Sequence, residues 1–250
     1  MLKDKATFWL SSLLGRGSDD RINRYSYEGK QLLPHRPAKH SIPMVYADYH
    51  DRVRKHNARA AADAIYNNAN ELVNNPTFNA RWNKAGTAPN NQPSDFSGKY
   101  KCNLFNHYVN ASTFAPSDGT NKHLINVNRA TGNLINASLL NRMFKNPSSY
   151  KNITSGKIFK VPAHLAPFAK GAVASSDTHM GIVMGDGTTA SAGDKLGAVR
   201  NDWGFRGNEK NMQYAYMLPE GVDGNVLLED AKKRRQEFIN GLLRKIVKYK

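Results

Sequence analysis

Residues 179–192 read HMGIVMGDGTTASA, and this stretch decides the fold class. A run of apolar and β-rich residues, His179 to Met184, is followed by the turn Gly185-Asp186-Gly187. A second short run, Thr188 to Ala192, comes directly after the turn. Two such runs joined by a glycine-containing turn are typical of a β-hairpin. The stretch therefore predicts two paired antiparallel strands.

Other elements are predicted on both sides of the hairpin. Apolar residues spaced three and four apart indicate helices, and Pro76 ends the first of them. The asparagine-rich stretch 116–162 has only short apolar patches and predicts no defined element. The predicted helices cover 48–74, 103–112 and 227–249, and further strands are expected over 196–199 and 213–218. This mixture predicts an α+β fold.

The composition limits the class of protein. The chain has 250 residues, a net charge of +16, 40% hydrophobic and 10% aromatic residues, so it can form a sizeable core and is not wholly disordered. It has no run of about 18 uncharged apolar residues, so we expect no transmembrane segment. The single cysteine, Cys102, excludes an internal disulfide framework and a cysteine-based zinc site. The positive charge favours binding to polyanions such as nucleic acid, an anionic membrane or the bacterial cell wall. It is also consistent with a basic surface that is simply solvated.

The two ends of the chain differ from its middle. Residues 7–14 are fairly apolar but lack a small-residue cleavage site, which favours a short amphipathic helix over a secretory signal. Residues 18–46 contain three closely spaced prolines and predict an extended connector, and 83–98 predict a loop or domain boundary. The expected division is a mainly helical N-terminal extension over 1–90, a catalytic domain over 91–220 and a helix over 221–250.

The C-terminal helix is predicted to be basic and amphipathic. Its apolar stripe includes Phe238, Leu242 and Ile246, and most of its lysines and arginines lie off that stripe. A surface helix that docks by its apolar face is the favoured interpretation. The alternative is a helix that lies on an anionic surface.

Cys102 and His179 are the residues that best fit a catalytic role. Cys102 opens a predicted helix, where backbone N–H groups and the helix dipole stabilise a thiolate and help to form an oxyanion hole. His179 begins an apolar strand, which would hold its ring rigidly, whereas the other seven histidines lie in ordinary contexts. The alternatives are an inert buried cysteine and a strand-end histidine with no catalytic role.

Two short motifs carry a family resemblance. The segment KCNLF at 101–105, with HMGIVMG at 179–185 downstream, resembles the NlpC-type cell-wall peptidases and amidases, which belong to the papain-like cysteine hydrolases. The segment KGAVA at 170–174 resembles the preceding family strand, although Ala172 stands where the family usually has aspartate. The resemblance covers residues 95–218 and implies a papain-like core in which the nucleophile helix packs on a small antiparallel sheet.

The resemblance also implies roles for particular residues. Cys102 would be the nucleophile and His179 the general base, and a polar residue would orient the imidazole. For that third residue Asp202 is favoured, then Asn201, with Ser191 as a further candidate; the alternative is that Asn201-Asp202 forms a turn. Tyr100, Ser191 and Trp203 are the candidate substrate-binding residues. No metal or cofactor is needed.

The resemblance implies cleavage of amide bonds in the peptide stem of peptidoglycan. The protein would reach the periplasm or cell wall without a clear signal peptide, as a type VI-like antibacterial effector with a cognate immunity protein, or as a phage lysin. One alternative is a papain-like toxin that acts on host protein amides or acyl lipids. Another is a non-enzymatic basic protein that binds nucleic acid or the cell wall, although no specific nucleic acid is expected.

Overall fold

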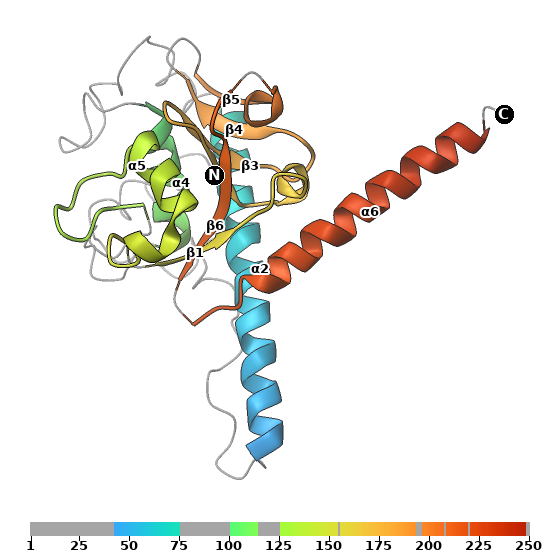
Figure 1. The fold of residues 1–250 in the computed structure, drawn as a ribbon, viewed down its shortest axis with the longest axis horizontal. Helices are drawn as coiled ribbons and strands as arrows, with labels where there is room; N and C mark the ends of the chain where they lie inside the picture. Colours follow the sequence, from blue (N-terminus) through green and yellow to red (C-terminus); the bar gives the residue numbers. More distant parts are fainter. Residues whose placement is uncertain are drawn as a thin grey trace.

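The structure is a computed structural model that describes residues 43–75, 101–114, 126–154, 156–193, 197–207, 209–219 and 221–248 (Figure 1). Its helices are α2 (Pro43–Asn74), α4 (Lys101–Phe114), α5 (Ala137–Lys145) and α6 (Asn225–Lys248). Its strands are β1 (Gly156–Lys160), β2 (Val173–Ser175), β3 (Met180–Val183), β4 (Thr189–Ala192), β5 (Ala198–Asn201) and β6 (Gln213–Pro219). Short 3₁₀ turns are η2 (Pro147–Tyr150), η3 (Ala166–Phe168) and η4 (Trp203–Phe205). The predicted α+β class is confirmed.

The six strands form one antiparallel sheet in the order β1-β6-β2-β3-β4-β5. The predicted hairpin at 179–192 is present, with Ile182 opposite Ala190 and a turn in which Gly185 and Gly187 have positive φ. Such φ values suit glycine, which explains the two glycines of this turn. The sheet therefore forms around the pair of strands that the sequence predicts most clearly.

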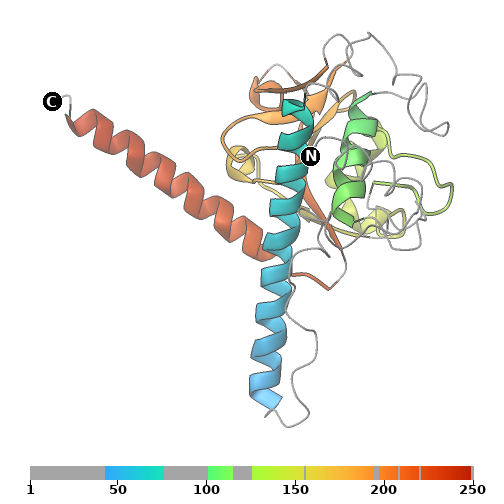
Figure 2. The ribbon, with the colours of Figure 1, turned by 180° about the vertical axis from the view of Figure 1, so that it is seen from behind.

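Each face of the sheet has its own buried core. The first core joins α4, α5 and the second half of α2 to side chains such as Met180, Ile182 and Ala190. The second core joins the start of α6 and the Ala58–Ala62 part of α2 to side chains such as Ala174 and Tyr216. Figure 2 shows α2 running along the sheet. Because side chains alternate between the two faces of a strand, neighbouring residues of β3 belong to different cores.

Helix α2 belongs to the folded domain, which differs from the N-terminal extension predicted over 1–90. Ile65 and Leu72 are buried in the first core, and Ala61 is buried in the second. The small side chains of α2 let the chain before β2 approach closely: a Cβ on Gly171 would lie 2.5 Å from the carbonyl oxygen of Ala62. The alanine-rich stripe that the sequence shows is therefore a close-packing face of the central domain.

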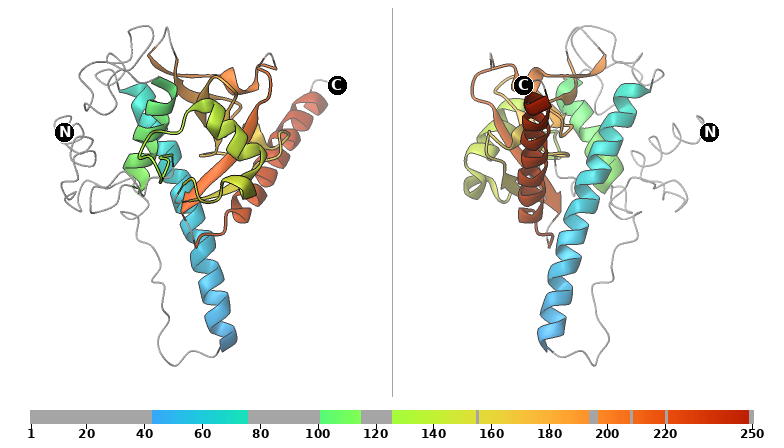
Figure 3. Two further views of the ribbon diagram at one scale, coloured as in Figure 1. Left: turned by 60° about the vertical axis from the view of Figure 1, so that its left-hand side comes forward. Right: turned by 90° about the vertical axis from the view of Figure 1, so that its right-hand side faces the viewer.

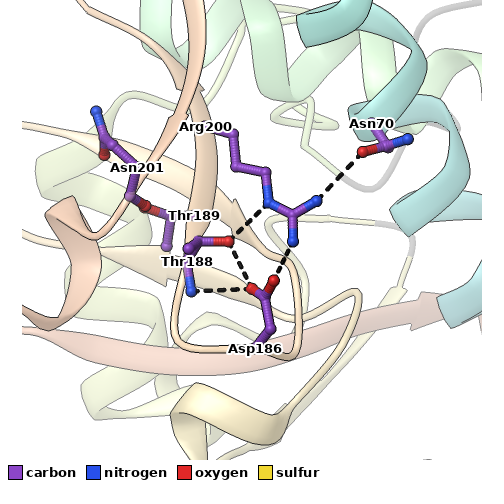
Figure 4. A network of polar contacts seen from close by, with 6 residues as sticks. All are labelled: Asn70, Asp186, Thr188, Thr189, Arg200 and Asn201. Atoms are coloured by element: carbon purple, nitrogen blue, oxygen red, sulfur yellow. Dashed lines mark hydrogen bonds and ion pairs between the residues drawn. The ribbon is translucent and has the colours of Figure 1, made fainter.

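A polar network fastens the β3–β4 hairpin to β5 and to α2 (Figure 4). Arg200 forms an ion pair with Asp186, donates to Thr188 Oγ1 at 2.8 Å and reaches Asn70 Oδ1 at 3.4 Å. Partial burial opposes ionisation of Asp186, but hydrogen bonds from Thr188 and the charge of Arg200 hold its pKa below the usual value. The network fixes the register of the hairpin at the end of β3 that is far from His179.

Several predicted elements are found with altered limits, and others were missed. The helices predicted over 103–112 and 227–249 correspond to α4 and α6, and the strands predicted over 196–199 and 213–218 to β5 and β6. Residues 43–46 open α2 instead of ending an extended connector, since proline is tolerated in the first helical turn. Within 116–162 the sequence showed no sign of α5 or β1. The expectations for 7–14, 18–42 and 83–98 lie outside the described residues.

Helix α6 packs on the domain through its first half. Arg234 donates to the Phe168 carbonyl at 2.6 Å, and the Phe238 ring lies 5.6 Å from that of Phe168. Leu227 and Ala231 are buried in the second core, and Arg59 of α2 binds Asp230 through two hydrogen bonds of 2.8 and 3.0 Å. The rest of the helix extends away from the sheet (Figures 1 and 3). The division predicted at residue 220 therefore does not separate α6 from the domain core. Among the described helices, none is both long and apolar enough to cross a membrane.

Candidate functional site

Cys102 is the second residue of α4, at the end of the helix where backbone N–H groups have no partner within the helix. Its side chain is buried, and it shares the first core with Met180, Ile182 and residues of α4 itself. Lys101, the first residue of the helix, is only 1% exposed. The predicted placement of the cysteine in the first turn of a buried helix is thus found.

His179 is held by the tight turn that joins β2 to β3. Ser176 and His179 are paired across the turn, because the Ser176 N–H donates to the His179 carbonyl at 2.9 Å. The Ser176 hydroxyl accepts from the His179 N–H at 3.1 Å. The backbone of His179 is therefore fixed on both of its polar groups, which a rigid catalytic histidine requires.

The imidazole of His179 lies beside Ser191 of β4. His179 Nε2 and Ser191 Oγ are 3.1 Å apart, and Ser191 is 2% exposed. In the tautomer that has its proton on Nε2, this N–H donates to Ser191 and Nδ1 is the basic nitrogen. Ser191 is therefore the residue that orients the imidazole among the candidates from the sequence.

Trp203 closes the other side of the imidazole. The two rings meet edge to face, with centroids 4.5 Å apart and planes at 86°. The indole is itself fixed, because Nε1 donates to Glu209 at 3.0 Å and the next residue, Gly204, donates its N–H to Thr189 Oγ1 at 3.3 Å. Ser191 and Trp203 together restrict the rotation of the ring.

The other candidates for the third residue have different partners. Asp202 is exposed and forms an ion pair with Arg206, four residues along the chain. The side chain of Asn201 accepts from the Trp203 N–H at 2.9 Å, which makes a local turn. The structure thus supports the alternative that Asn201-Asp202 is a turn. Tyr100 lies outside the described residues.

Cys102 and His179 both lie next to β3. Met180, the residue after His179, is in the first core with Cys102, and its sulfur accepts a hydrogen bond from Asn106 Nδ2 at 3.2 Å. His179 directly precedes β3, and its ring meets that of Trp203, which packs against the second core. The structure therefore brings His179, Ser191 and Trp203 together, and it joins α4 to this group through Met180.

Two features of the site had no signal in the sequence analysis. Ser176 bonds the His179 backbone because a two-residue turn between β2 and β3 places the two residues opposite each other. The sequence analysis did not predict that turn. The burial of Lys101 was equally unexpected, since lysine is mostly exposed in folded proteins. Among the described residues, histidine, cysteine, aspartate and glutamate form no group of three that could hold a metal ion.

A second buried histidine lies on the same helix as Cys102. His107 is completely buried, and this loss of hydration lowers its pKa to about 4, although a hydrogen bond with Asn126 acts in the opposite direction. The ring is therefore neutral at physiological pH. It is a packing residue of α4.

His107 should make the stability of the domain depend on pH. The unfolded chain binds a proton at this site near pH 6.5 and the folded chain only near pH 4, so stability is complete above about pH 6.5 and falls as the pH drops toward 4. The full effect corresponds to about 3 kcal/mol in the free energy of unfolding. Urea unfolding of wild type and His107→Gln across this range measures it. The wild type should lose more stability than the variant, and equal losses would contradict the assignment.

Comparisons with known proteins add no relative to this description. No family model matches the chain, and neither the curated proteins nor the solved structures include a match to it.

Proposed function

We propose that this chain is a cysteine hydrolase that cleaves amide bonds in the peptide stem of peptidoglycan. The observation that carries the proposal is the hydrogen bond of 3.1 Å between His179 Nε2 and Ser191 Oγ, because a polar partner that orients an imidazole is what a general-base histidine needs. The position of Cys102 in the first turn of a helix that packs on β3 and β4 also supports it.

In the proposed reaction Cys102 Sγ passes its proton to Nδ1 of His179 and attacks the carbonyl carbon of the scissile amide. The C–O double bond opens to an oxyanion, which backbone N–H groups at the start of α4 stabilise. When the oxyanion collapses, the C–N bond breaks and the imidazolium gives its proton to the leaving amine. Water then hydrolyses the thioester and restores the thiol, with the imidazole again acting as base.

The substrate class follows from the resemblance of the two motifs and agrees with the charge. A chain with net charge +16 is attracted to an anionic cell wall. In this proposal the protein acts in the periplasm or cell wall as a delivered antibacterial effector with a cognate immunity protein, or as a phage lysin. Purified sacculi are then the direct substrate.

Digestion of purified sacculi tests the proposal. The expected result is a fall in turbidity, the appearance of new amino groups, and stem peptides that mass spectrometry shows to be cut at one amide bond. Sacculi left intact by the folded full-length protein would contradict the proposed substrate. Steeply salt-dependent DNA binding without hydrolysis would instead favour a basic nucleic-acid-binding protein.

Ser191→Ala should reduce turnover by about tenfold, because the lost hydrogen bond no longer holds the imidazole in one tautomer. Michaelis constants should change little, since Ser191 acts through His179. Thr113→Val is the matched control: it removes a buried hydroxyl that bonds the Val109 carbonyl in the last turns of α4. Steady-state kinetics on soluble stem peptides compare the two. Equal losses in both variants would show that Ser191 has only a structural role.

A further inference from the structure

The second half of α6 has a continuous apolar face that is open to solvent. Its members are between 45% and 73% exposed: Phe238, Leu242, Leu243, Ile246 and Val247. Elsewhere in the described part of the chain, large hydrophobic side chains are buried or partly buried. The expectation that α6 docks by its apolar face therefore holds as far as Phe238, whose ring lies 5.6 Å from that of Phe168, and is wrong from Leu242 onward.

The spacing of these residues makes the face broad. Phe238, Leu242 and Ile246 follow one another at intervals of four, and Leu243 and Val247 form a second row one residue further along. At about 100° per residue the two rows, with Ile239, cover about half of the circumference of the helix. This is wider than the narrow seam by which two helices pair in a coiled coil. A broad, flat surface is a better match than a single helix.

The remaining half of α6 is strongly basic. Residues 232–248 contain seven lysines and arginines against one acidic residue, Glu237. Arg244 and Lys245 are exposed and lie between the apolar positions in sequence, on the other side of the helix. A second copy of the chain would bring two such positive helices together, so like-charge repulsion disfavours self-association. The positive charge of α6 favours binding to an anionic partner.

We propose that the second half of α6 binds the surface of an anionic lipid bilayer, with its apolar face among the acyl chains and its basic residues at the headgroups. An interfacial helix needs this combination of a broad apolar face and a cationic polar face. Figures 1 and 2 show that this half leaves the sheet and α2, and beyond Phe238, whose ring contacts Phe168, its large apolar side chains are exposed from Leu242 onward. The binding goes beyond the proposed hydrolase activity and does not depend on it.

Co-sedimentation with lipid vesicles tests this inference. The full-length protein should bind vesicles of phosphatidylcholine mixed with phosphatidylglycerol, and bind phosphatidylcholine alone much more weakly. Ile246→Glu should lower the partition coefficient about tenfold, because it places a charge at the centre of the apolar face. Asn240→Glu makes the same change of charge on the polar side and should cost much less. Replacing Arg244 and Lys245 by Gln should weaken binding to anionic vesicles about fivefold for each residue.

Three outcomes would overturn the inference. The first is no binding to anionic vesicles, and the second is equal loss in Ile246→Glu and Asn240→Glu. The third is a concentration-dependent dimer in analytical ultracentrifugation that Ile246→Glu abolishes. That result would mean that a second copy of the protein, and not a membrane, covers the apolar face. Because the readout is binding, none of these results depends on whether the protein cleaves peptidoglycan.

Discussion

Cys102→Ala should abolish hydrolysis of sacculi, with a loss of about 10⁴-fold or more in turnover. The proposed route has no alternative nucleophile, because Cys102 is the only cysteine in the chain. Alanine removes one buried sulfur and leaves the α4 backbone intact, so the fold should survive. Turbidity clearing and the release of stem peptides measure the loss, and thermal unfolding monitors the fold.

The single cysteine also allows a chemical version of the same test. Iodoacetamide should inactivate the enzyme with a stoichiometry of one, and substrate should protect against the reaction. Val109→Ala is the matched control for damage to α4, since Val109 is a fully buried residue of that helix; this variant should lose stability and keep its activity. Full activity in Cys102→Ala, or in fully alkylated protein, would exclude Cys102 as the nucleophile.

The hairpin and its neighbours show what the sequence can predict about this fold. The turn at 185–187 demands glycines with positive φ, and the runs on either side have the length and composition of strands. These signals are local, so they predict the hairpin without any knowledge of the rest of the molecule. Strand β1 has no such signal: it lies at the edge of the sheet, pairs only with β6 and carries lysines at Lys157 and Lys160.

The third residue of the site illustrates the limit of chemical reasoning. A carboxylate such as that of Asp202 is a stronger hydrogen-bond acceptor for an imidazole than a hydroxyl is. In the structure, however, this carboxylate forms an ion pair with Arg206, four residues further along the chain. Ser191 is twelve residues from His179, and only the register of β3 against β4 places it beside the ring. The hairpin signal predicts that the two strands pair, but it does not specify the register that sets such a contact.

Helix α6 shows a different limit. Periodicity predicts the helix and the side that is apolar, but it contains no information about what covers that side. The first turns bury Leu227 and Ala231 against the domain, whereas Ile246 and Val247 are exposed. Whether an apolar residue of α6 is buried against the domain or exposed to solvent depends on the direction in which the helix leaves the sheet (Figure 3). The same holds for α2, whose alanines looked like a separate extension and instead allow close contact with the sheet.

His179→Ala should lower turnover by about 10³-fold, because the thiol loses the base that takes its proton and the leaving amine loses its acid. His179→Gln should lose nearly as much although its amide can still donate to Ser191, since an amide does not exchange a proton near neutral pH. His164→Ala is the matched control, because His164 is exposed and lies outside the site. Steady-state kinetics on soluble stem peptides measure all three variants.

The pH dependence of alkylation at Cys102 tests whether the two residues act together. In wild type the imidazole should stabilise the thiolate, so that iodoacetamide reacts at lower pH than with His179→Ala. The His179 ring packs with Ser191 and Trp203, and Cys102 is buried in the first core, so the coupling of the two residues needs this direct test. Identical alkylation profiles in the two proteins would mean that no dyad forms, even if Cys102→Ala is inactive. A profile moved to higher pH in His179→Ala and unchanged in His164→Ala would establish the coupling that the mechanism requires.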